Sequence, residues 1–414
     1  MLENYYKDPD AVERLRSGPL GPYLDLAVTS LVGEGYTAST VRSHLWAAGH
    51  FGRWLAANGH GAGELDQRIV DSYLDERRRE GKLHRSQPAA VRHVLDHLRE
   101  EGVVPVQEPA GAESPIERLL VRYKKHLRVG RGLTEATVVN YRPYIHRFLT
   151  ERFGDEPLRL QYLMPSDVSR FLVRQSQSLA HGSARVMTAA LRSLFRFLLQ
   201  NGEIEVDLAA AVLTVADWRQ GSVPKYLAPK EVERLLEACD RNTGVGRRNY
   251  AILLLLARLG LRAGEVVALE LDDIDWRAAE LTVPGKGLSR ESVPLPSAVG
   301  EALAAYLALD RPSCATRRVF ICMRAPHRGL AHPSTVSTLV RRALERADLH
   351  PPTRGAHLLR HSLATGLLRE GASMAEIGQL LRHRSPNTTE IYAKVDFNGL
   401  RALALPWPGT GGVR

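Results

Sequence analysis

Two long stretches at the start of the chain carry apolar residues at every third or fourth position, which is the spacing of amphipathic helices. Thr, Ser and Asp precede many of these stretches and Gly ends several, as helix start and stop signals do. The pattern breaks at residues 105–115, which contain three prolines, and again at 217–228. We therefore predict helical domains at 1–104 and 116–216, two linkers, and a third domain at 229–414.

The third domain mixes two periodicities. Helical spacing predicts helices at residues 229–239, 249–259, 297–309, 333–347, 358–370 and 374–381. Apolar and polar residues alternate at 280–287 and 289–296, which predicts a β-hairpin or small sheet. The predicted fold class is mainly α (α+β), with helical N-terminal domains and a mostly helical C-terminal domain that contains a small antiparallel β-sheet.

The two helical stretches also resemble one another. Thr40-Val41 followed by Phe51 recurs as Thr137-Val138 followed by Phe148, at an offset of 97 residues. Two readings stay open: an internal duplication, or two unrelated helical bundles whose shared period produces such matches.

Charge and cysteine usage narrow the class of protein. Lys and Arg total 56 against 46 Asp and Glu, giving a formal net charge of +10, which favours a polyanionic partner such as nucleic acid. The three cysteines match no zinc-ligand spacing and indicate reduced thiols. The N-terminus lacks a signal pattern, and the longest apolar run, residues 251–257, is too short to span a bilayer. We expect a cytoplasmic protein.

The third domain contains the residue types that phosphodiester transfer without a metal requires: a nucleophile, cations for the phosphoryl oxygens and an acid for the leaving oxygen. The candidates are Arg262 in GLRAGE, Lys286 in PGKG, His357 and Arg360 in HLLR, His383, and Tyr392 nine residues later. Taken singly, Arg262 is ordinary on a helix rim and Lys286 is ordinary in a solvated turn. His357 and Arg360, three apart, share one face of a helix.

This ordered set resembles the tyrosine recombinase (phage integrase) family, in its Xer-like branch and with a mobile-element setting. The family's pattern of Arg, Lys, HxxR, a second His and Tyr is matched by Arg262, Lys286, His357, Arg360, His383 and Tyr392. The resemblance covers residues 226–400 closely and the second helical stretch loosely. One departure is Arg382, which takes a position where relatives often have glycine. It is expected either to contact DNA or to point into solvent.

The resemblance implies a mechanism. Tyr392 attacks the scissile phosphate and forms a 3′-phosphotyrosyl intermediate, while Arg262 and Arg360 hold the non-bridging oxygens. Lys286 is the candidate general acid, and His357 and His383 bind the phosphate or move the tyrosine proton. Glu265 is expected to orient the neighbouring side chains. No nucleotide cofactor is expected, because the phosphodiester energy is conserved, and no metal is expected, because side-chain cations hold the phosphoryl oxygens.

The expected partners are double-stranded DNA with specific recombination sites and further copies of this chain, as a tetramer that resolves a Holliday junction. Accessory recombinases or directionality factors are further candidates. The two N-terminal domains are then DNA-binding, the first as an additional core-binding-like or arm-binding module. The candidate DNA contacts are Arg42, Lys124, Lys125, Arg128, Arg131, Arg185, Arg192, Arg196 and Arg382.

Three alternatives compete with this interpretation. A metalloenzyme is suggested by His357 and His361, spaced i and i+4, but Leu358 stands where a zinc-binding HExxH motif has Glu. A type IB topoisomerase-like strand transferase shares the chemistry and would relax DNA without a specific site. A catalytically decayed DNA-binding protein would bind DNA without cutting it.

Overall fold

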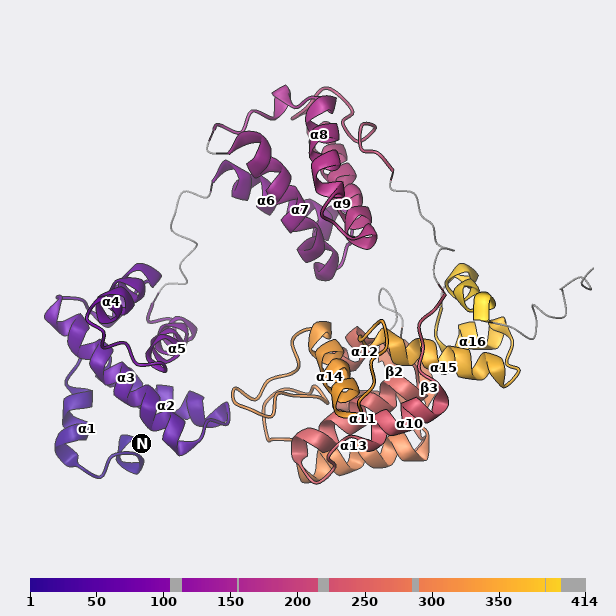
Figure 1. Cartoon of the computed structure of the whole chain (residues 1–414). Helices are drawn as coiled ribbons and strands as arrows, with labels where there is room; N and C mark the ends of the chain where they lie inside the picture. Colours follow the sequence, from indigo (N-terminus) through magenta and orange to yellow (C-terminus); the bar gives the residue numbers. More distant parts are fainter. Residues whose placement is uncertain (105–113, 155, 215–222, 285–289, 384, 396–414) are drawn as a thin grey trace, which may run out of the picture. The chain divides into compact units, whose positions relative to one another are not determined.

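The computed structural model describes residues 1–104, 114–154, 156–214, 223–284, 290–383 and 385–395. The chain divides into two compact units, one formed by residues 1–105 and 220–414 and the other by 106–219 (Figure 1). The described residues are mainly helical and include one small antiparallel sheet, which confirms the predicted fold class. The three-domain division stays a prediction, although residues 2–104, 116–212 and 227–359 each contribute a separate hydrophobic cluster.

The N-terminal segment of the first unit is built around one long helix. Its α-helices are α1 (Pro9–Arg16), α2 (Leu24–Gly33), α3 (Ala38–Ala57), α4 (Gln67–Arg79) and α5 (Gln87–Glu100). Helix α3 begins after Thr37, whose side chain accepts a hydrogen bond from the Thr40 amide at 3.3 Å. Val41, Leu45 and Phe51 on its inner face are buried, so α3 supplies the centre of this hydrophobic cluster.

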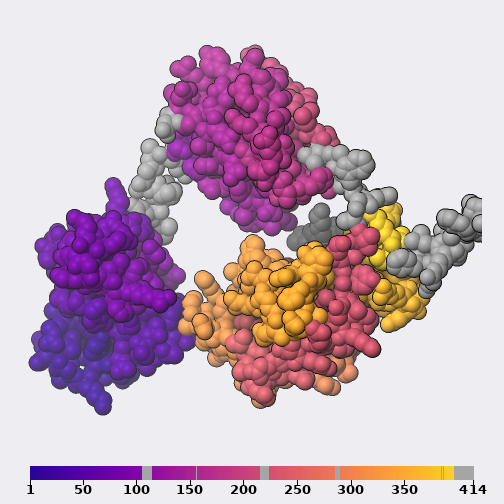
Figure 2. Space-filling view, viewed as in Figure 1, coloured from indigo at the N-terminus to yellow at the C-terminus, as the bar shows by residue number. Residues whose placement is uncertain are grey.

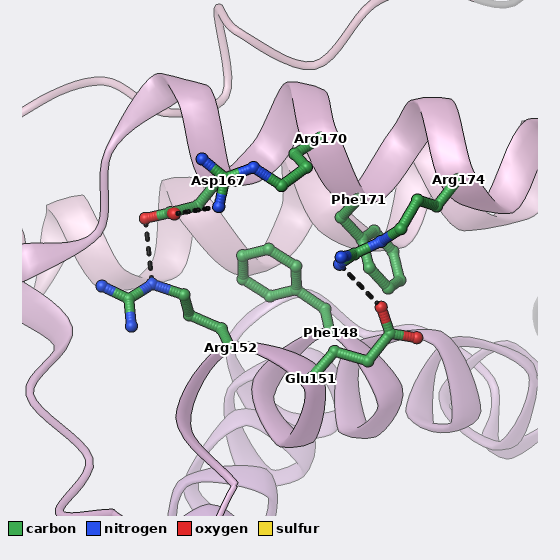
Figure 3. A pocket seen from close by; sticks show the side chains of 7 residues that line it. All are labelled: Phe148, Glu151, Arg152, Asp167, Arg170, Phe171 and Arg174. Carbon is green, nitrogen blue, oxygen red and sulfur yellow. Dashed lines mark hydrogen bonds and ion pairs between the residues drawn. The ribbon is translucent and has the colours of Figure 1, made fainter.

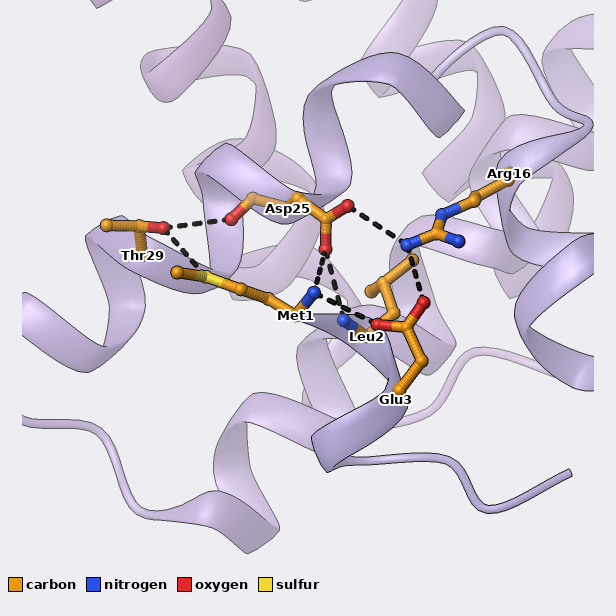
Figure 4. A network of polar contacts seen from close by, with 6 residues as sticks. All are labelled: Met1, Leu2, Glu3, Arg16, Asp25 and Thr29. Atoms are coloured by element: carbon orange, nitrogen blue, oxygen red, sulfur yellow. Dashed lines mark hydrogen bonds and ion pairs between the residues drawn. The ribbon is translucent and has the colours of Figure 1, made fainter. Parts of the chain in front are cut away.

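A network of charges ties the first residues to α1 and α2 (Figure 4). The terminal ammonium of Met1 lies 3.0 Å from Glu3 and 2.9 Å from Asp25. Arg16 on α1 bridges the same two carboxylates at 2.7 and 3.2 Å. These groups are exposed, so the network fixes local geometry and contributes little to the free energy of unfolding.

The second unit is a helical bundle whose core lies between its two longest helices, α7 and α9. Its α-helices are α6 (Pro115–Lys125), α7 (Glu135–Phe153), α8 (Pro165–Ser176) and α9 (His181–Gln200). Figure 2 shows this bundle as one continuous body of side chains. Phe148 and Phe195 pack edge to face at 5.5 Å inside it. Phe51 and Phe148, the repeated pair noted in the sequence, are both buried in a long helix that follows a threonine N-cap.

The C-terminal part of the first unit contains the remaining helices and the sheet. Its α-helices are α10 (Pro229–Glu237), α11 (Gly244–Arg258), α12 (Ala263–Ala268), α13 (Ser297–Leu309), α14 (Pro333–Arg346), α15 (His357–Arg369) and α16 (Met374–Leu380). The strands are β1 (Ile274–Asp275), β2 (Glu280–Pro284) and β3 (Arg290–Pro294), paired antiparallel in that order. Residues 251–257 of α11 are all buried, so this helix is the centre of the core.

Most predicted elements of this part are confirmed, and two features differ. Helix α11 begins five residues before its predicted start, because the Thr243 side chain accepts from the Gly246 amide at 3.1 Å and caps the helix earlier. The short elements α12 and β1 were not predicted, since six and two residues are too few to show a period. Strand register pairs Leu281 with Val293, so both point into the core.

Several predicted features lie outside the described residues. They are the hairpin tip with Lys286, residues 105–113 of the first linker, residues 217–222 of the second linker, and the tail after residue 395. Within the part that the structure describes, no helix is both long and apolar enough to cross a membrane.

Candidate active site

Arg360 on α15 joins the segments that carry two other predicted site residues. Its guanidinium donates from Nη1 to the carbonyl of Gly260 and from Nη2 to the carbonyl of Leu381. Gly260 lies two residues before Arg262, and Leu381 lies two residues before His383. The Arg360 side chain is buried, and this loss of water lowers the pKa of its guanidinium to about 10, so it remains charged at neutral pH. One buried cation thus positions both neighbouring chain segments.

Gly260 allows the chain to approach α15 and α16 closely at the turn after α11. Its φ of +59° lies in the left-handed region, which a residue with Cβ adopts only with strain. A Cβ atom there would stand 2.6 Å from Leu381 Cδ2 and 3.1 Å from Leu363 Cδ2. Glycine is therefore required by both backbone conformation and space, and the position of Arg262 depends on it.

The Glu265 carboxylate binds two arginines, Arg262 and Arg382, that lie far apart in the sequence. Its Oε2 accepts from the Arg262 amide at 2.8 Å, which starts α12, and its Oε1 accepts from Arg262 Nη1 at 2.6 Å. Arg382 Nη2 lies 2.9 Å from the same carboxylate. Burial raises the pKa of Glu265, but the Arg262 amide and the two guanidinium groups outweigh it and hold this pKa below its ordinary value. The carboxylate is therefore ionised at neutral pH.

Arg382 differs from both expectations stated for it. Its side chain is only 6 % exposed and faces neither solvent nor an open surface, because Glu265 draws the guanidinium inward. Its backbone carbonyl also accepts from Arg262 Nη2 at 3.3 Å. The predicted DNA contact through this side chain does not fit its position here.

The three histidines of the site cluster around Arg360. His383 Nδ1 lies 2.8 Å from Thr389 Oγ1, and the rings of His357 and His361 are 6.4 Å apart on successive turns of α15. Burial, followed by the charges of nearby arginines, lowers the pKa of His383 to about 4. Burial and then His357 lower the pKa of His361 to about 4. Both rings are therefore neutral at pH 7 and act as hydrogen-bonding groups.

Tyr392 is enclosed in a small apolar cluster formed by α15, α16 and the turn that carries it. The side chain is 1 % exposed and packs with Ala364, Ile377 and Leu381. Its hydroxyl oxygen lies 2.9 Å from His361 Nδ1. Burial raises the pKa of Tyr392 to about 12, with Arg360 opposing the shift. In this state the hydroxyl is neutral and inaccessible to a DNA strand.

His361 is the residue of this site to which sequence reasoning assigns no part in phosphoryl transfer. It follows Arg360 directly in HLLRHS, and i, i+4 spacing from His357 places both rings on one face of α15. Taken alone, that spacing suggests only a metal site. Its contact with Tyr392 depends on tertiary packing across 31 residues, which the sequence pattern does not encode.

The structure brings together Arg262, Glu265, His357, Arg360, His383 and Tyr392 near α15 and α16. His357 belongs to this group because it lies on α15, 6.4 Å from His361 between ring centroids; burial, followed by the charges of Arg360 and Arg262, lowers its pKa. Lys286 lies outside the described residues, between β2 and β3. Within the described part of the chain, no three His, Cys, Asp or Glu side chains are grouped as ligands of one metal ion.

The second unit contains a charged pocket of about 300 Å³ between α7 and α8 (Figure 3). Arg152 lies 3.0 Å from Asp167, and Arg174 lies 3.0 Å from Glu151, beside the rings of Phe148 and Phe171. Each of these two arginines has a carboxylate partner, so the pocket is lined by ion pairs between α7 and α8.

The predicted DNA contacts of this unit differ in their surroundings. Some already have protein partners: Lys124 and Arg128 contact Glu135 at 2.8 and 3.6 Å, Arg131 donates to Ser193, and Arg192 donates to the Val212 carbonyl. Lys125, Arg185 and Arg196 are exposed, as Lys124 and Arg128 also are. The structure thus gives Arg192 a structural contact, because α9 turns it toward the chain that leaves the bundle.

The arrangement gathers arginines, histidines and a tyrosine, which are the residue types that the resemblance assigns to this site. Residues 225–398 match the phage integrase family, and residues 120–202 match the phage integrase N-terminal SAM-like domain. The chain belongs to the phage integrase family of tyrosine recombinases, and its function is site-specific DNA recombination.

Relatives and solved structures give the extent of the likeness. A putative integrase/recombinase y4rA of Sinorhizobium fredii is 43% identical over 407 residues, covering 98% of this chain and 99% of that protein. The tyrosine recombinase XerD of Mycobacterium tuberculosis is 35% identical over 306 residues, covering 69% of this chain and 95% of that protein. A crystal structure of the XerH site-specific recombinase in a post-cleavage complex with palindromic difH substrate has a TM-score of 0.57 at 21% identity. The match covers 82% of this chain and 94% of that chain.

Proposed function

We propose that Tyr392 is the nucleophile of this recombinase and that Arg262, Lys286, His357, Arg360 and His383 form its phosphate site. The Tyr392 oxygen attacks the scissile phosphorus and forms a 3′-phosphotyrosyl bond as the bond from phosphorus to O5′ breaks. Lys286 gives a proton to the departing O5′, and the tyrosine proton passes to a histidine. Joining reverses these steps with a 5′-hydroxyl from another strand, so two exchanges pass through a Holliday junction.

The observation that carries this proposal is the pair of contacts made by Arg360. Because its guanidinium binds the Gly260 and Leu381 carbonyls, the segments bearing Arg262 and His383 are held on either side of one buried cation. Planar guanidinium groups remain charged and match phosphate geometry. A phosphate bound there would offset the arginine charges that lower the pKa of His357 and His383, and so favour protonated histidine beside it.

The proposal requires Tyr392 to leave its buried position when DNA binds. A neutral, enclosed tyrosine with a pKa near 12 is a poor nucleophile in the free protein. Its hydroxyl must break the contact with His361 and reach the phosphate, where the positive field of the arginines lowers the cost of ionisation. DNA binding and nucleophile release are thereby coupled.

A nicked suicide substrate built from the ends of the mobile element tests the assignment. Cleavage of such a substrate traps the covalent protein–DNA adduct, which a denaturing gel resolves. With chelator present, the wild type and the exposed control Tyr162→Phe should form the adduct, and Tyr392→Phe should form none. An adduct that persists in Tyr392→Phe contradicts the assigned nucleophile, and an adduct that disappears on chelation contradicts metal-free transfer.

The same substrate separates the rival functions. DNA that shifts in a native gel without forming an adduct would indicate a decayed DNA-binding protein. Relaxation of supercoiled plasmid that lacks the recombination site would indicate topoisomerase-like activity.

The proposed partners are double-stranded DNA carrying specific sites and further copies of the chain, as a tetramer on paired sites. The post-cleavage XerH complex and a lambda integrase dimer on a COC′ core site are DNA-bound neighbours of the same fold. Directionality factors or accessory recombinases would select the outcome. A mobile-element setting fits the near full-length match to the putative integrase/recombinase y4rA, which includes the residues before 120 that both family models leave unmatched.

We assign a DNA-binding surface to the outer face of α3, which carries the predicted contact Arg42. Arg42, Trp46 and Arg53 are exposed along this face, and residues 38–57 contain no Asp or Glu. The Trp46 ring lies 4.4 Å from His50 and 5.8 Å from His84. Cations beside an exposed aromatic ring suit a phosphate backbone and its sugars. Arg42→Ala with Trp46→Ala should weaken binding to full-length sites at unchanged folding stability.

A further inference from the structure

Arg382 occupies a backbone position that ordinarily belongs to glycine. Helix α16 ends with hydrogen bonds from the Arg382 amide to the Gln379 carbonyl and from the His383 amide to the Gly378 carbonyl, both 2.9 Å. This pattern is the Schellman motif, and it places Arg382 at a φ of +54°. A residue with Cβ is strained in this conformation, so an arginine here requires a compensating contact.

The compensating contact is the buried carboxylate of Glu265. Arg382 Nη2 lies 2.9 Å from Glu265 Oε2, and the two side chains are 6 % and 9 % exposed. A second donor, Nη1, reaches the Leu380 carbonyl at 3.3 Å. The side chain of Arg262, bound to the other carboxylate oxygen, is 39 % exposed. One carboxylate is therefore shared by an inner and an outer arginine.

The charges of this trio decide how freely Arg262 can move. A buried carboxylate with a single guanidinium partner would hold that partner firmly, because separation would leave an unpaired buried charge. Glu265 has a second partner, so its charge stays neutralised when Arg262 turns outward. The outer arginine is the one assigned above to the phosphate.

We propose that Arg382 is a positioning residue that acts as the standing counter-ion of Glu265 and thereby releases Arg262 to bind the scissile phosphate. This inference rests on the proposed function of Arg262. It gives the strained backbone at Arg382 a mechanistic role: the arginine acts through Glu265, and its own guanidinium does not touch DNA.

The matched variants are Arg382→Gly, Glu265→Gln and the double variant. Glycine suits the +54° backbone and keeps the carbonyl that accepts from Arg262, so Arg382→Gly removes only the counter-ion. Asp348→Gly is the control, because Asp348 is another strained residue, at a φ of +52°, that lies after α14 outside the site. Arg382→Lys retains the charge.

Single-turnover adduct formation on the nicked substrate is the measurement. Arg382→Gly should cleave about 10-fold more slowly than wild type while its affinity for DNA stays within about 2-fold. Asp348→Gly should cleave at the wild-type rate, and Arg382→Lys should recover part of the loss. In the Glu265→Gln background the Arg382→Gly change should have no further effect, because a neutral side chain needs no counter-ion.

Three results would overturn the inference on Arg382 alone. They are wild-type cleavage by Arg382→Gly, an equal loss from Arg382→Gly in the Glu265→Gln background, and a loss of DNA affinity that accounts for the whole defect. The last would make Arg382 a phosphate contact. Absence of an adduct from the wild type would overturn the assigned catalytic set and this inference with it.

Discussion

The active-site cluster and the helical bundle of the second unit both contain many arginines, but they hold them differently. In the cluster, Arg360 is buried and bonded to two backbone carbonyls. In the bundle, Arg122 pairs with Glu203 at 2.8 Å and Arg142 pairs with Glu117 at 2.7 Å, and both arginine side chains are exposed. A buried cation has one geometry, whereas a pair with an exposed arginine contributes only about 0–1 kcal/mol to the free energy of unfolding. The comparison separates residues that form a site from residues that cover a surface.

The largest expected effect comes from the buried cation. Arg360→Lys should reduce the rate of adduct formation by about 10²–10³-fold, because a point charge cannot hold two carbonyls and a phosphate together. Binding to DNA, measured by native gel shift, should change far less, because the bundle supplies surface cations of its own. Arg122→Lys is the matched control in the bundle and should cleave at the wild-type rate. Similar rates for both variants would remove the distinction between the two regions.

Packing around the site gives the next effect. Gly260→Ala should lower the free energy of unfolding by about 3 kcal/mol, since it combines a left-handed φ with a contact 2.6 Å from Leu381. Gly202→Ala in the second unit has a similar φ of +68° but meets no atom within 4 Å, so about 1 kcal/mol is expected. Chemical denaturation compares the two. An equal loss of unfolding free energy in the two variants would mean that the chain at Gly260 is not tightly packed against Leu381.

The sequence predicted the residues of the active-site cluster, but it predicted few of the contacts that these residues and the surface arginines make. Arg262, His357, Arg360, His383 and Tyr392 stand at spacings that match the family pattern, and the fold brings their chain segments close together. The contact of His361 with Tyr392 and the inward turn of Arg382 depend on tertiary packing, which no local pattern specifies. The sequence also does not predict contacts such as that of Lys124 with Glu135, because the same pattern of charges on a helical face occurs whether its partner is DNA or a carboxylate.

The two buried histidines predict how stability depends on pH. In the folded protein the pKa values of His361 and His383 are lowered to about 4, below the ordinary value of 6.5, chiefly by burial. Between pH 6.5 and 4 the unfolded chain therefore binds more protons, so stability is complete above about pH 6.5 and falls as the pH falls toward 4. Thermal melting should give a Tm a few degrees lower at pH 5 than at pH 7.

A double variant tests the source of that pH dependence. His361→Gln with His383→Gln should flatten the change in Tm between pH 7 and pH 5, whereas the surface control His350→Gln should retain it. A dependence of unchanged slope in the double variant would assign the effect to other groups.

The smallest effect is expected at the surface of the bundle. Lys125 and Arg196 are exposed, and Arg196→Ala or Lys125→Ala should weaken DNA binding a few-fold and reduce the slope of log K against log salt by about 0.9 for each phosphate that the side chain neutralises. Arg122→Ala is the matched control, because Arg122 is held by Glu203 and should leave the slope unchanged. If all three variants reduce the slope equally, ion pairing in the free protein does not exclude a cation from the DNA interface. In the protein–DNA complex, phosphates would then compete with carboxylates for each arginine, and a surface ion pair in the free protein would not identify an arginine that stays off the DNA.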